Sequence, residues 1–179
     1  MRSAILALVL LVCSVMEAGA AVFHSKEAAL RLAFPEAESV EARTIFLAPG
    51  EIRRIEDLAQ SRLESRLVTV YVGRKAGGVL GYAFIETHVV RTMPETVLIV
   101  LTPEGRVRAV HVLAFHEPLD YLPSSRWLGQ FAGCRLTPYL RVGREIHGIS
   151  GATLSSRAIS DAVRRLLAIY RVKLAEDRR

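Results

Sequence analysis

The fold is decided by residues 148–170, which read GISGATLSSRAISDAVRRLLAIY. From residue 154 onward, apolar side chains recur at helical spacing at Leu154, Ala158, Ala162, Leu166 and Tyr170. The opposite face is charged and carries Arg157, Asp161, Arg164, Arg165 and Arg171. A helix with one apolar face must bury that face against another layer. The sequence therefore predicts a long C-terminal helix that packs on the rest of the domain.

Runs rich in β-forming residues precede this helix, at residues 67–72, 79–90, 96–101 and 107–115. They are separated by Gly77-Gly78, by Met93-Pro94 and by Pro103-Glu104-Gly105. Turns this short join antiparallel neighbours. We therefore predict an α+β fold in which an antiparallel sheet is packed by the long C-terminal helix.

The remaining segments flank this sheet. Residues 21–66 are predicted to be an N-terminal helical extension, with a helix over 25–34 that Pro35 stops, an extended segment over 38–47 and a second helix over 49–59. Residues 119–140 are mixed, with prolines that mark loops and a helical turn or two near Trp127. We expect this stretch to form the wall of a site.

The first residues carry a targeting pattern. After Met1-Arg2 the chain is almost wholly apolar from Ala4 to Met16, and Ala18-Gly19-Ala20 offers a cleavage site. This pattern predicts a secretory signal peptide over residues 1–20, with an uncleaved anchor as the alternative. Either way the protein is expected to be exported, to the periplasm or the outer face of the cytoplasmic membrane. The mature chain keeps Cys134 alone, so no internal disulfide is expected.

The chain is basic, with a formal net charge of +6. Basic and aromatic residues are not interleaved as in nucleic-acid-binding proteins, so we expect an acidic partner or an anionic membrane face and no nucleic acid. The spacing of His24, His88 and His111 does not indicate a metal site.

The segment over residues 148–156 concentrates small and hydroxyl side chains just before the helix. Glycine and alanine allow a ligand to approach the main chain, and Ser155 or Ser156 is predicted to cap the helix. The free N–H groups and the helix dipole favour a phosphate at this point. The alternative is a capped helix after a tight turn, with no ligand.

The string Ser150-Gly151-Ala152-Thr153-Leu154-Ser155-Ser156 resembles the signature of the FMN-binding domain family. That family includes exported flavin subunits of Rnf complexes and of sodium-translocating NADH:quinone reductases, and regulators of nitrous oxide reduction. Weaker similarity extends upstream, at Gly81-Tyr82, residues 103–107, His116-Glu117-Pro118 and residues 127–131.

The resemblance implies an FMN-binding domain over residues 67–173, with FMN joined to Thr153 by a phosphoester. A flavin transferase would attach FMN from FAD with a divalent metal. The resemblance also implies an electron carrier or redox subunit of a membrane complex rather than a stand-alone enzyme. The signature residues implied to bind the cofactor are Ser150, Gly151, Ala152, Thr153, Leu154 and Ser155.

The family usually has Asp three positions before the serine of the signature, and this chain has His147 there. That Asp is associated with recognition by the flavin transferase. Two interpretations stay open, since His147 is either tolerated or leaves FMN bound without the ester.

Apolar and aromatic side chains are expected to pack against the flavin ring. The candidates are Tyr121, Leu122, Trp127 and Phe131, with Glu117 or His116 near the ring edge. Arginines near the ring would adjust its redox potential, and the candidates are Arg126, Arg144 and Arg157. The alternative for each of these is an ordinary core, loop or surface residue.

Two other functions compete with a flavoprotein. Residues 148–152 superficially resemble the nucleophile elbow of a serine hydrolase, but Ala152 replaces the final glycine and no Asp-then-His order follows Ser150. The other alternative is an exported, non-catalytic interaction module.

Overall fold

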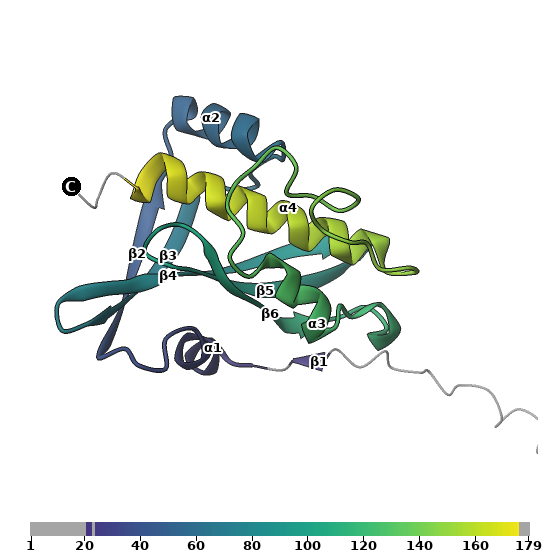
Figure 1. Cartoon of the computed structure of the whole chain (residues 1–179), viewed down its shortest axis with the longest axis horizontal. Coiled ribbons are helices and arrows are strands. Elements are labelled where there is room, and N and C mark those ends of the chain that lie inside the picture. Colours follow the sequence, from purple (N-terminus) through teal and green to yellow (C-terminus); the bar gives the residue numbers. More distant parts are fainter. Residues whose placement is uncertain (1–20, 23, 176–179) are drawn as a thin grey trace, which may run out of the picture.

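The computed structural model describes residues 21–22 and 24–175. The predicted signal peptide at residues 1–20 lies outside these residues. The strands form one sheet in the order β1-β6-β5-β4-β3-β2, and every pairing is antiparallel (Figure 1). Their bounds are Ala21–Val22 (β1), Ser39–Phe46 (β2), Leu67–Lys75 (β3), Gly78–Val90 (β4), Met93–Leu101 (β5) and Val107–Phe115 (β6).

The helices cover both faces of this sheet. The α-helices are α1 (Lys26–Ala33), α2 (Pro49–Ala59), α3 (Ser125–Leu128) and α4 (Thr153–Ile169), and α4 continues into a π-turn, η3 (Tyr170–Leu174). Short 3-10 turns lie at Leu119–Tyr121 (η1) and Gly129–Phe131 (η2). In Figure 1, α4 and α2 lie on one side of the sheet and α1 on the other. The predicted α+β fold with a long C-terminal helix is confirmed.

The larger core lies between the sheet and α4. Val97, Ile99 and Leu101 of β5 are fully buried there with Ile159 and Val163 of α4. The intervening β5 residues face the other side, where they pack with α1. Because both faces of β5 are covered, residues 97–101 form a continuous apolar run rather than an alternating one.

Residues from the predicted N-terminal extension belong to the same core. Strand β2 pairs with β3 along its whole length, from Ser39 opposite Arg74 to Phe46 opposite Leu67. Ile55 and Ala59 of α2 are fully buried in the cluster that α4 forms with the sheet. Residues 39–59 thus supply an edge strand and a covering helix to the sheet.

The far end of α4 is fixed on the hairpin between β5 and β6. The Tyr170 hydroxyl donates a hydrogen bond to the Pro103 carbonyl at 2.6 Å. The Tyr170 ring lies against Gly105, where a Cβ would be 2.0 Å from its Cε1 atom, and the Gly105 φ is +70°. Only glycine fits this turn, so the contact sets where α4 lies along the sheet. Within the described residues, no helix is both long enough and apolar enough to cross a membrane.

Candidate functional site

Helix α4 begins at Thr153, and its N-cap residue is Ala152, which provides no side-chain hydrogen bond. The predicted cap at Ser155 or Ser156 is wrong, because both serines lie inside the first turn. The Ser156 hydroxyl instead donates back to the carbonyls of Ala152 and Thr153, at 2.9 and 3.1 Å. Gly151 precedes the cap with φ +83°, and a Cβ on this residue would meet nothing within 4 Å beyond its chain neighbours. This glycine is therefore required for conformation rather than for space.

The first N–H groups of α4 are therefore available to a hydrogen-bond acceptor on a ligand. The first N–H groups of a helix have no partner within the helix, and here no side chain caps them. The positive end of the helix dipole adds to their attraction for an anion. Thr153 is exposed at this point, so its hydroxyl is accessible from solvent.

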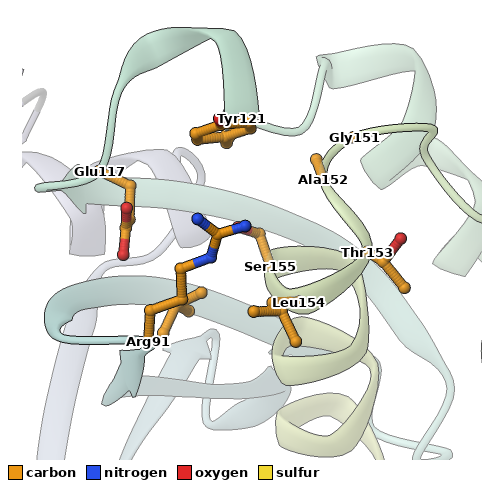
Figure 2. A pocket seen from close by; sticks show the side chains of 9 residues that line it. Arg91, Glu117, Tyr121, Gly151, Ala152, Thr153, Leu154 and Ser155 are labelled. Atoms are coloured by element: carbon orange, nitrogen blue, oxygen red, sulfur yellow. The ribbon is translucent and has the colours of Figure 1, made fainter.

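A pocket with an empty volume of about 410 Å³ lies beside the start of α4. Three segments line it (Figure 2): the end of β4 and its turn, the loop that follows β6, and the first residues of α4. Its lining residues are Val90, Arg91, Glu117, Tyr121, Gly151, Ala152, Thr153, Leu154 and Ser155.

The charged side chains of this pocket are Arg91, which follows β4, and Glu117, in the loop after β6. The Arg91 guanidinium lies 5.3 Å from the centroid of the Tyr121 ring. The Glu117 Oε1 atom is buried and has no hydrogen-bond partner among the described residues. A buried carboxylate oxygen without a donor is costly, so it favours a ligand that brings an N–H or O–H group. The pocket thus combines a cation, an aromatic ring and an unused acceptor next to an anion-binding helix start.

Residues 93–168 match the model of the FMN-binding domain family. The chain carries an FMN-binding domain. FMN is accordingly its cofactor, and the matched range includes Glu117, Tyr121 and the whole Ser150–Ser156 signature.

Solved structures show the same fold, and six chains match. One is NqrC from Shewanella oneidensis, with a TM-score of 0.52 and 14% sequence identity, over 85% of this chain and 88% of that chain. At this identity the similarity concerns the fold alone. No curated protein matches the chain.

The structure brings most of the predicted cofactor-binding residues of this domain into one pocket. Gly151, Ala152, Thr153, Leu154 and Ser155 line it together with Glu117 and Tyr121. In Figure 2 the Thr153 side chain points away from Arg91 and Glu117, on the other side of the helix start. Thr153 therefore lines the pocket at the helix start, while its side chain points away from the two charged residues.

Other predicted residues lie elsewhere. Ser150 is exposed just before the pocket and has no hydrogen bond to a histidine among the described residues, so it lacks the base that a serine nucleophile needs. Leu122 lines a different hollow, beside His24 and His111. The His116 Nδ1–H donates to the Pro94 carbonyl, 3.0 Å away. The arginines predicted near the ring, Arg126, Arg144 and Arg157, are exposed and do not line this pocket.

Trp127 and Phe131 are core residues rather than pocket residues. They are 7% and 0% exposed, and their rings pack edge to face with centroids 5.4 Å apart. The Trp127 indole donates to the His147 carbonyl at 2.6 Å, and the Gln130 side-chain oxygen accepts from the His147 N–H at 2.9 Å. These contacts fix the backbone of His147, just before the signature, so Trp127 positions this segment without lining the pocket.

Val90 and Arg91 are pocket residues that were not predicted from the sequence. They lie at the turn between β4 and β5, where Arg91 has φ +53°. In an antiparallel sheet this turn and the end of β6 lie at the same edge, because Glu95 of β5 pairs with Phe115 of β6. The antiparallel order that the short turns predict could therefore have placed Val90 and Arg91 beside the loop after β6. Within the part of the chain that the structure describes, no cluster of histidine, cysteine or acidic residues could hold a metal ion.

Proposed function

We propose that this protein is an exported electron-transfer flavoprotein in which a phosphoester joins FMN to Thr153. The observation that carries the proposal is the exposed Thr153 at the uncapped start of α4, next to a pocket in the FMN-binding domain.

The residues present fit the parts of FMN. The first N–H groups of α4 suit its phosphate, because they lack side-chain caps and lie at the positive end of the dipole. Tyr121 and Leu154 offer apolar surface for the ring, and Arg91 and Glu117 offer a cation and an acceptor. When bound, FMN supplies reversible electron transfer, and the charges of Arg91 and Glu117 would adjust its potential.

Attachment requires a transferase rather than the chain's own chemistry. The Thr153 oxygen would form a bond to the FMN phosphorus of FAD, while the pyrophosphate bond of FAD breaks and AMP leaves. The hydroxyl proton would pass to a base of the flavin transferase. Such a reaction needs a hydroxyl that another protein can reach, and Thr153 is exposed. His147, at the position associated with transferase recognition, is exposed as well.

Export and the redox partner are part of the same proposal. The pattern of residues 1–20 supports secretion, and a covalent link would prevent loss of FMN outside the cytoplasm. The net charge of +6 supports docking on an acidic partner or an anionic membrane surface. We propose a membrane redox complex as the electron-transfer partner.

Intact mass spectrometry tests the covalent link. Coexpression with a flavin transferase should add the mass of one FMN less one water to the chain. Thr153→Ala should abolish the addition, whereas Ser150→Ala, at a neighbouring exposed hydroxyl, should retain it. An unmodified parent chain, or a Thr153→Ala chain that still gains the mass, contradicts the phosphoester at Thr153.

The colour of the purified protein reports FMN binding, and release of the flavin on denaturation shows whether the link is covalent. A yellow protein whose flavin is released by denaturation retains the FMN-binding function but lacks the ester. A colourless protein after coexpression and export supports the alternative of a non-catalytic interaction module.

A further inference from the structure

A second pocket lies further along α4, with an empty volume of about 470 Å³. Its lining includes Gln60, Arg141, Arg157, Ser160, Asp161 and Arg164, and we call it the arginine pocket. Ser160 follows Thr153 by seven residues, so the two side chains start about 10 Å apart along the helix axis. The arginine pocket and the pocket beside the start of α4 share none of their lining residues.

Ser160 offers an unused hydroxyl to this pocket. It is 1% exposed, and its Oγ atom has no hydrogen-bond partner among the described residues. A serine inside a helix often donates to the carbonyl four residues earlier, as Ser156 does to Ala152. Ser160 does not make that bond, so its buried hydroxyl is available to a ligand in the pocket it lines.

Arg164 lines the pocket and is held by backbone carbonyls. It is 1% exposed, and its guanidinium donates to the carbonyls of Ala59, Thr137 and Leu140 at 2.6, 3.0 and 3.1 Å. A longer contact of 3.5 Å reaches the Leu58 carbonyl. These acceptors satisfy its hydrogen bonds but are neutral, so its positive charge stays uncompensated by direct contact.

Positive charge exceeds negative charge in the pocket. The side chains of Arg141 and Arg157 form no hydrogen bond or ion pair within the described part of the chain. Burial lowers the pKa of Arg164, and the like charge of Arg141 lowers it further. Asp161 is the carboxylate among the lining residues, and burial raises its pKa while the surrounding arginines oppose that rise.

We propose that the arginine pocket binds a phosphate group, free or at the end of a small molecule, at a site separate from Thr153. Arg141 and Arg157 supply unused charged donors that line the same cavity, and a planar guanidinium group can bind two phosphate oxygens at once. The Ser160 hydroxyl supplies a neutral donor from the helix side. The buried Arg164 holds the wall in place and adds to the attraction.

Calorimetric titration at low salt tests this site. The Thr153→Ala chain is titrated with inorganic phosphate and, in a second arm, with glycerol phosphate. Saturable binding is expected, and the arm with the higher affinity identifies free or esterified phosphate as the preferred form. Because this chain cannot form the ester, the result does not depend on FMN attachment. Binding that is unchanged when Arg141 and Arg157 are both replaced by Gln would assign the phosphate to the open start of α4 and overturn the proposal.

Matched variants separate a specific site from general charge. Arg141→Gln combined with Arg157→Gln should weaken phosphate binding by about tenfold or more, and Ser160→Ala by a few-fold. Arg171→Gln, an exposed arginine ten residues after Asp161, should leave binding unchanged. Urea midpoints confirm that each variant is folded. Absence of saturation, or an equal loss in Arg171→Gln and in the double variant, overturns the proposal.

Discussion

The indole nitrogen of Trp127 donates a hydrogen bond to the backbone carbonyl of His147 at 2.6 Å. The N–H of His147 is held as well, by the Gln130 side-chain oxygen at 2.9 Å. Both backbone polar groups of His147 are therefore bound to the short helical segment that precedes it in the chain. Thr153 follows six residues later, so this contact fixes the approach to the start of α4.

Trp127→Phe should lower the free energy of unfolding by about 1–2 kcal/mol, because it leaves a partly buried carbonyl without its donor. An aromatic ring remains to pack against Phe131, so the variant isolates the hydrogen bond. Urea denaturation measures the loss, and the FMN-modified fraction should fall in parallel. Arg126→Gln, at the exposed neighbour, is the control. A Trp127→Phe chain as stable as the parent would show that the His147 carbonyl is satisfied in another way.

Elements with strong periodicity could be predicted from sequence. Helix α4 has one apolar stripe over its whole length, and the strands β4, β5 and β6 are joined by short turns. Because strands joined by such short turns pair as antiparallel neighbours, the order of β4, β5 and β6 follows from their order in the sequence. The position of β2 was less evident, because its burial pattern is mostly exposed and its partner β3 lies beyond α2.

The candidate site could be predicted only in part. The signature at residues 150–156 identified one wall, but Arg91 lies in the turn between β4 and β5, and only the pairing of β5 with β6 brings that turn beside the loop after β6. Trp127 was expected beside the ring because aromatic residues commonly line flavin sites. Its burial against Phe131 and its bond to His147 give it a supporting place instead.

Arg164→Met should destabilise the fold by about 3 kcal/mol or more, because several backbone carbonyls would lose a charged donor in a buried place. The affected carbonyls belong to the end of α2 and to the loop over residues 137–140. Urea denaturation measures the effect, with Arg157→Met, at an exposed arginine of the same helix, as the control. Similar midpoints for the two variants would show that the Arg164 contacts contribute little.

Asp161→Asn should stabilise the fold at neutral pH, because burial raises the pKa of Asp161 above its ordinary value of 3.8. The folded chain thus favours the protonated carboxyl, and stability falls as the pH rises from 3.8 through the raised pKa. Asparagine removes this ionisation, so the gain should shrink toward zero below pH 3.8. Thermal melts across this range measure it, with Asp57→Asn, exposed on α2, as the control. A gain that does not depend on pH contradicts the assignment.

His147→Asp should raise the FMN-modified fraction of the chain on coexpression with a flavin transferase. The backbone of His147 is hydrogen-bonded to Trp127 and Gln130, so the substitution should leave the loop conformation unchanged. Because His147 is exposed, the substitution does change the side chain that a transferase would contact. Intact mass spectrometry gives the modified fraction. His147→Asn is the matched control, because it has a similar size to Asp but no charge. An increase with Asp alone assigns recognition to the carboxylate, whereas an unchanged fraction would show that His147 already serves the transferase.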